Sequence, residues 1–175
     1  MLVPLAGVPI GQPEWAAAQF GIGLLFWPVV IALLLVRVAV QGMWPERFLP
    51  ASLILIAPPS AVGLSALQLG ASTLVGWTLW GMALFSLLWV APLACRIANQ
   101  SFGLSHWGMS FPLEALAALT LRLAPSVPLS LVGIALLAMT SLLVAAFLLA
   151  TARGLRGGSL LAPEPVAATM PISVP

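Results

Sequence analysis

Charged side chains are scarce in this sequence, and lysine, aspartate and tyrosine are absent altogether. Charged residues make up 6% of the 175 residues, whereas soluble domains carry about 25%. With 62% hydrophobic residues and a mean hydropathy of +1.15, the chain lacks the polar surface that a protein needs to face water on all sides. The composition therefore excludes an ordinary soluble domain and indicates a membrane protein.

The residues that most enzyme and metal sites require are also scarce. Histidine and cysteine occur once each, as His106 and Cys95, so neither a histidine pair for a metal nor an internal disulfide can form. There is no aspartate for a Ser-His-Asp arrangement, no Gly-x-Ser-x-Gly and no phosphate-binding glycine loop. We expect no catalytic residue, no metal and no cofactor, and we place His106 at the end of a loop near the membrane interface.

Long apolar runs are what the sequence has in abundance. A bilayer core about 30 Å thick needs about 20 apolar residues in a helix. Five runs fit, of which the fourth is the shortest, and they predict an all-α, polytopic membrane protein. They cover residues 20–40, 50–69, 72–95, 108–123 and 129–151. We expect residues 1–19 to be a loop or the end of a preceding helix, and residues 152–175 to be a disordered cytoplasmic tail.

The arginines predict the orientation of these spans. With five spans, one side of the membrane receives five of the six arginines, and the other side receives Arg122. The positive-inside rule makes the first side cytoplasmic, so the C-terminus lies inside and the N-terminus outside. An exported N-terminus without a signal peptide is unusual, and an odd number of upstream spans would remove the difficulty, so we interpret the chain as a fragment. The five arginines of the cytoplasmic side are Arg37, Arg47, Arg96, Arg153 and Arg156.

Three short motifs stand out from the apolar background. The first is Trp-Pro-Glu-Arg-Phe-Leu-Pro at residues 44–50, a loop before the second span. The second is Leu-Ile-Ala-Pro-Pro-Ser-Ala-Val-Gly at residues 55–63, inside that span. The third is His-Trp-Gly-Met-Ser-Phe-Pro-Leu at residues 106–113, which opens the fourth span. The second and third motifs place prolines inside predicted helices.

Prolines at these positions predict kinks. Each proline removes a backbone donor and frees the carbonyl four residues earlier, so Pro58, Pro59 and Pro112 should bend their helices. In lipid, neighbouring groups or water in a cavity must satisfy the freed carbonyls. With Ser60 and Ser110 beside them, the kinked helices are consistent with walls of a polar pathway. They fit equally well the plain bends that prolines introduce in membrane helices.

In this order and spacing, the three motifs resemble one family. It comprises the tellurite-resistance TehA proteins, the slow-type anion channels and the malate (four-carbon dicarboxylate) transporters. The Pro-Leu-Ala-Gly at residues 4–7 is similar to the end of the family's preceding span, and the resemblance covers residues 3–151. It implies helices six to ten of a ten-helix channel, built of helical hairpins around a central pore. It also implies a homotrimer with one pore in each subunit.

The resemblance further implies a gate. In the family, a phenylalanine side chain plugs the pore near mid-membrane, and Phe111 matches it by its place before Pro112. Such a ring blocks ions by excluding water from an apolar constriction. Without the resemblance, Phe111 would be interpreted as a core or lipid-facing residue.

Glu114 departs from the family pattern. It follows Phe111 by three residues and therefore shares its helix face. An ionisable residue within a span is by default a functional candidate. A carboxylate beside an anion path would repel the permeant ion, unless burial keeps it neutral or Arg96 or Arg122 pairs with it. A paired carboxylate at a helix interface is the structural alternative.

We therefore expect an integral protein of the plasma membrane (the bacterial inner membrane) that is not an enzyme. Its expected partners are the lipid bilayer and small anions such as chloride, nitrate and malate-like dicarboxylates, with no nucleic acid. Its expected function is a channel or secondary transporter for such anions. The alternative is a non-transporting membrane subunit, or a non-functional truncated fragment of such a channel, because half a ring of hairpins cannot enclose a pore.

Overall fold

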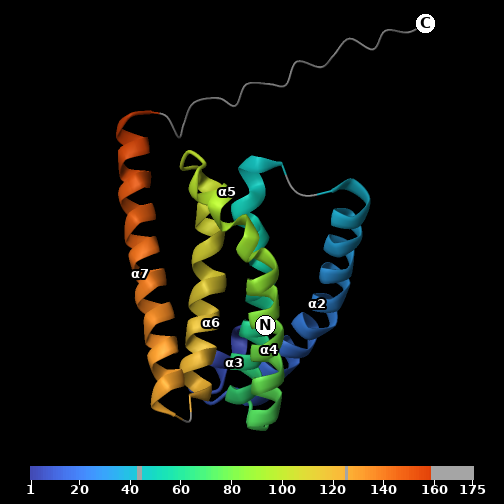
Figure 1. Cartoon of the computed structure of the whole chain (residues 1–175). Helices are drawn as coiled ribbons and strands as arrows, with labels where there is room; N and C mark the ends of the chain where they lie inside the picture. The colour runs from blue at the N-terminus through green and yellow to red at the C-terminus, as the bar shows by residue number, and fades with distance from the viewer. Residues whose placement is uncertain (43–44, 125, 159–175) are drawn as a thin grey trace, which may run out of the picture.

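The computed structural model describes residues 1–42, 45–124 and 126–158, and the regular elements within these residues are all helical (Figure 1). The predicted all-α, polytopic membrane fold is thus confirmed. The elements are α1 (Val3–Gly7), α2 (Pro13–Gln41), η1 (Glu46–Ile56), α3 (Ala57–Gln68), α4 (Thr73–Val90), η2 (Ala91–Leu93), α5 (Ala94–Ala98), η3 (Leu104–Met109), α6 (Ser110–Leu123) and α7 (Val127–Arg156), where η marks a 3₁₀ helix.

Four helical segments within the described residues are long and apolar enough to cross a membrane: Pro13–Gln41, Glu46–Gln68, Thr73–Ala98 and Val127–Arg156. They coincide with four of the five predicted spans.

The outer two of these segments extend beyond their predictions. Helix α2 begins at Pro13 rather than near residue 20, because a proline in the first turn is preset for a helix. Helix α7 continues to Arg156, so residues 152–156 are helical and not part of a disordered tail. Residues 159–175 of the predicted tail, and the tryptophan that opens the motif at 44–50, lie outside the described residues.

The fourth predicted span, at 108–123, is built from two joined helices. Helix α6 alone has 14 residues, fewer than the about 20 that a crossing needs. The 3₁₀ helix η3 runs directly into it, because Met109 and Ser110 both keep right-handed helical dihedrals at the junction. At a rise of about 2.0 Å per 3₁₀ residue and about 1.5 Å per α residue, the joined segment is about 33 Å long. Its length is therefore close to the thickness of the bilayer core.

Helices α3 and α6 form the centre of the bundle. Helix α3 packs against α4 and α6, and α6 packs also against α7. A Cβ atom built on Gly63 of α3 would come within 2.8 Å of a methyl of Leu119 on α6, so the glycine permits the close approach that membrane helices use. The indole nitrogen of Trp80 on α4 donates to Thr120 Oγ1 on α6 at 2.9 Å. These contacts fix the orientation of α6 within the bundle.

Helix α2 stands largely apart. Ala16 is its only buried residue, and it lies against Gly7 of α1, where an added Cβ would come within 2.6 Å of the Ala16 Cβ. Figure 1 shows α2 close to the other helices at its N-terminal end and separated from them at its C-terminal end. The apolar side of α2 therefore has no helical partner along most of its length within the described part of the chain.

The two ends of the bundle differ in charge. Figure 1 places the start of η1, helix α5 and the end of α7 at one end, and the end of α6 at the other. Arg96 of α5 and Glu46 of η1 form an ion pair at the first end, with Arg96 Nη2 3.1 Å from Glu46 Oε1. The arrangement agrees with the predicted separation of five arginines from Arg122, and we call the first end the arginine-rich end.

Candidate functional site

Helix α6 exposes one narrow stripe although it lies at the centre of the bundle. Its exposed residues are Phe111, Glu114, Ala118 and Arg122, and their spacing of three, four and four brings them onto one side of the helix. We call this stripe the open face of α6. The rest of the helix is largely buried; its buried residues are Pro112, Leu113, Ala115, Leu116, Ala117, Leu119, Thr120 and Leu123.

The open face places an aromatic ring and a carboxylate near the middle of the joined η3–α6 segment. Along the joined η3–α6 segment, Phe111 lies about 15 Å and Glu114 about 20 Å from its start, out of a total of about 33 Å. The side chain of Phe111 is 44% exposed. Arg122 lies at the far end of the same face. The face therefore changes from apolar to acidic to basic along its length.

Glu114 has no ion pair or hydrogen bond with any described residue. Of the two arginines considered as its possible partners, Arg96 is bonded instead to Glu46 at the arginine-rich end. Arg122 follows Glu114 by eight residues, which separates them by about 12 Å along the helix axis. The carboxylate is thus presented openly beside Phe111.

The prolines act through 3₁₀ segments. Helix η1 ends at Ile56. The N–H of the next residue, Ala57, donates to the carbonyl of Ile54. That carbonyl, which Pro58 would free in an α-helix, therefore keeps a partner. The residues that could donate to the carbonyl of Leu55 in a 3₁₀ helix and in an α-helix are Pro58 and Pro59, respectively. Neither has an N–H, so this carbonyl receives no helical hydrogen bond from them.

The third motif contains a similar junction. Here η3 passes into α6 just before Pro112, and both the N–H and the hydroxyl of Ser110 bond the carbonyl of Trp107, the hydroxyl at 2.9 Å. The two junctions lie close together, because Ile56 at the end of η1 and Leu113 at the start of α6 belong to one buried cluster with Ala83 and Leu116.

The predicted site residues separate into two groups by exposure. Pro59, Ser60 and Pro112 are fully buried, and Ser60 Oγ donates to the carbonyl of Ile56 at 2.9 Å. Within the described residues, these three therefore lie at the junctions between 3₁₀ and α segments and present no open surface. Pro58 and Ser110 are half-buried. Phe111 and Glu114 are the predicted residues with open surface on α6.

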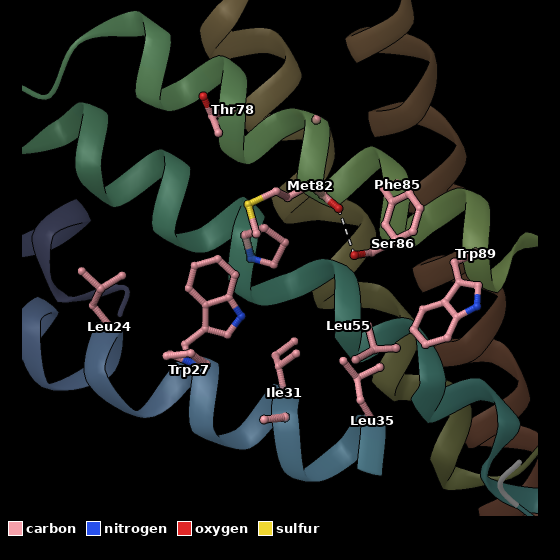
Figure 2. Close-up of a pocket in the computed structure, with 14 residues that line it drawn as sticks. Leu24, Trp27, Ile31, Leu35, Leu55, Thr78, Met82, Phe85, Ser86 and Trp89 are labelled. Carbon is pink, nitrogen blue, oxygen red and sulfur yellow. Dashed lines mark hydrogen bonds between the residues drawn. The ribbon is translucent and has the colours of Figure 1, made fainter. Parts of the chain in front are cut away.

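A cavity of about 880 Å³ lies between α2 and α4. Figure 2 shows Trp27 and Ile31 of α2 on one side of it and Met82 and Phe85 of α4 on the other. The hydroxyl of Ser86 donates to the carbonyl of Met82 at 2.9 Å, and no charged side chain lines the cavity. The cavity is apolar and therefore offers no charge to attract an anion.

Sequence reasoning missed two features of the site. Ala118 and Arg122 complete the open face, and their spacing from Glu114 was the signal that could have identified them. His106, expected at a loop end, is instead 7% exposed within η3, with its ring 5.5 Å from that of Phe102. Residues 104–109 form a helical turn that carries the imidazole inward, so the expected loop position is wrong.

The chain matches known proteins over most of its length. The family model described as voltage-dependent anion channel, SLAC1, matches residues 1–154. The S-type anion channel SLAH2 of Arabidopsis thaliana is 27% identical over 126 residues, which cover 70% of this chain and 24% of that protein. This chain thus spans about a quarter of the length of that curated relative, and no solved structure matches it. The match from α1 almost to the end of α7, together with the proline-bearing inner helices, shows that the chain belongs to the SLAC1 family of voltage-dependent anion channels.

Proposed function

We propose that this chain forms part of the wall of an anion-conducting pore and that the open face of α6 is turned toward the permeation path. The observation that carries the proposal is the exposure of Phe111, Glu114, Ala118 and Arg122 on a helix that is otherwise buried in the bundle. A central helix with an open, partly charged stripe needs a polar environment or further helices beside it, because lipid solvates charge poorly. A water-filled path satisfies this need.

Phe111 is the gate in this proposal. Its ring is partly exposed near the middle of the joined η3–α6 segment, and Pro112 and Leu113 beside it are buried, so the backbone that carries the ring is held in place. An apolar ring at the narrowest point excludes water and so raises the energy of an ion there. Anions of the class of chloride, nitrate and four-carbon dicarboxylates are the proposed permeant species, and a homotrimer is the proposed assembly.

Anion flux into liposomes tests the gate. Phe111→Ala is expected to raise the chloride or malate flux about tenfold or more, which corresponds to lowering a barrier by about 1.4 kcal/mol. Phe85→Ala is the matched control, because Phe85 is exposed on α4 beside the apolar cavity and should leave the flux unchanged.

Two results would contradict the proposal. An equal effect of both substitutions would show that Phe111 has no special position. Absence of flux in all three proteins, also after co-expression with the upstream part of a family member, would favour the alternative of a non-transporting membrane subunit. The assembly is checked separately by light scattering of the purified protein, where a trimer mass is expected.

A further inference from the structure

A second cavity lies at the arginine-rich end of the bundle, between α4, α5, η3 and α7, with a volume of about 550 Å³. It is separate from the open face of α6, since none of Phe111, Glu114, Ala118 or Arg122 lines it. Apolar residues such as Leu87 and Leu143 form most of its wall, so it is an intramembrane cavity of a different kind from the proposed pore.

The polar side chains of this cavity, Gln100 and His106, lie at one end, and one of their groups has no hydrogen-bond partner. The side-chain nitrogen Nε2 of Gln100 is buried and has no hydrogen-bond partner. His106, which is 7% exposed, lines the same end of the cavity, and its Nδ1 lies 3.1 and 3.2 Å from backbone atoms of Gly103. A buried amide donor without an acceptor costs about 1 to 3 kcal/mol. A ligand with an acceptor at this end of the cavity would remove this cost.

The cavity changes from polar to apolar along the bundle axis. Gln100 and His106 lie near the arginine-rich end, and the wall formed by α7 runs from Ala150 back to Leu143, a distance of about 10 Å toward the membrane centre. No polar side chain is found at the deeper end. This gradient matches an acyl chain whose ester group lies at the membrane interface and whose tail points to the midplane.

The charges near the cavity indicate which kind of lipid would occupy it. Arg96 belongs to the short helix α5, whose residues Ala94 and Ile97 line the cavity, and it pairs with Glu46. Arg153 and Arg156 follow the lining residue Ala150 in the last turns of α7, at the same end of the bundle. Cationic residues at this depth attract anionic lipid headgroups.

We propose that this cavity binds one acyl chain of an anionic phospholipid from the leaflet at the arginine-rich end. The ester carbonyl accepts a hydrogen bond from Gln100 Nε2, and the phosphate lies at the arginine-rich rim. The site does not depend on conduction through the pore, so it stands or falls independently of the proposed function.

Native mass spectrometry of the purified full chain tests the site, with phosphatidylglycerol and phosphatidylcholine of identical acyl chains as probes. The wild type is expected to retain phosphatidylglycerol more tightly than phosphatidylcholine. Gln100→Leu is expected to weaken retention of both lipids about two- to tenfold, because it removes the bond to the ester carbonyl. Gln41→Leu, at an exposed position on the end of α2, is the matched control and should not change retention.

A second variant fills the cavity. Ala146 is exposed on α7 and lines the cavity, so Ala146→Trp is expected to expel the acyl chain while Gln100 remains. If Ala146→Trp does not fold, the result for Gln100→Leu alone tests the proposed site. This variant is expected to fold, because leucine keeps the volume of the side chain and removes a donor that has no partner. In lipid-free micelles Gln100→Leu should be at least as stable as the wild type, which a merely structural role of Gln100 would contradict.

Three results would overturn the assignment. Unchanged retention of both lipids in Gln100→Leu would remove Gln100 from the site. Equal binding of phosphatidylglycerol and phosphatidylcholine to the wild type would remove the role of the arginine-rich rim. Displacement of the phospholipid by an equal concentration of palmitate would identify a free fatty acid as the occupant.

Discussion

At the scale of single residues, Glu114 dominates the electrostatics of the open face of α6. Its carboxylate has no partner among the described residues and follows Phe111 by one helical turn. At a separation of about 8 Å and an effective dielectric constant of about 20, two like charges repel by about 2 kcal/mol. A permeant anion that passes Phe111 would therefore meet a barrier of this order at Glu114.

Removal of this charge should speed conduction. Glu114→Gln keeps the shape of the side chain and is expected to raise anion flux near neutral pH about 5- to 30-fold, the factor that corresponds to 1 to 2 kcal/mol. Liposome flux of chloride measures the effect. Glu14→Gln is the control, because Glu14 is exposed in the first turn of α2, far along the chain from α6. Equal flux in wild type and Glu114→Gln would mean that Glu114 does not face the path.

At the scale of elements, the inner helices owe their shape to the way in which prolines are accommodated. An uninterrupted 3₁₀ helix of 11 residues, as in η1, is unusual, because runs longer than three or four residues are uncommon. Pro58 and Pro59 deny α-helical partners to the carbonyls before them, whereas a 3₁₀ bond to Ala57 still satisfies Ile54. The sequence predicted the places at which the regular α-helix is interrupted. It could not predict their 3₁₀ form, because packing of Leu49, Ser52 and Ile56 also determines the backbone there.

Close helix packing makes one glycine of α7 sensitive to substitution. A Cβ on Gly133 would lie 2.7 Å from Leu121 Cδ2 and 3.3 Å from the Leu121 backbone nitrogen, and backbone cannot move as a side chain can. Gly133→Ala is therefore expected to lower stability by about 1 to 3 kcal/mol. Thermal unfolding in detergent measures the change.

Gly21 provides the comparison for Gly133. No atom lies within 4 Å of a Cβ built on Gly21 of α2, so Gly21→Ala should be neutral or raise stability by about 0.5 to 1 kcal/mol through helix propensity. A Gly133→Ala protein as stable as the wild type would show that α6 and α7 do not pack as closely as described.

At the scale of the whole molecule, what could be predicted is what depends on local composition. Apolar runs located the membrane helices, and prolines located the irregular backbone. The open face of α6 was predicted only in part, because the side on which a helix lacks neighbours depends on how α3, α4 and α7 surround it. The same reason explains why the inward position of His106 and the separation of α2 were missed. Both depend on contacts between segments that are distant in sequence.

The charge asymmetry of the bundle predicts its orientation in the membrane, and Cys95 offers a direct test. It is a free, exposed cysteine of α5, at the arginine-rich end, and the sequence contains no other cysteine. If the positive-inside rule sets the topology, this end faces the cytoplasm. A membrane-impermeant maleimide should then leave Cys95 unlabelled in intact cells that express the chain and should label it in inverted membrane vesicles.

The opposite end supplies the control for this experiment. Ser126 is exposed just before α7, at the end of the bundle where α6 finishes, so Ser126→Cys in a Cys95→Ser background should react from outside intact cells. Labelling of Cys95 from outside, with Ser126→Cys protected, would invert the topology and place the arginine-rich end outside. The acyl-chain site proposed between α5 and α7 would then belong to the outer leaflet, where a preference for anionic lipid has less electrostatic support. Reactivity of both positions from the same side would contradict the crossing of the membrane by the joined η3–α6 segment, because that segment connects the two ends.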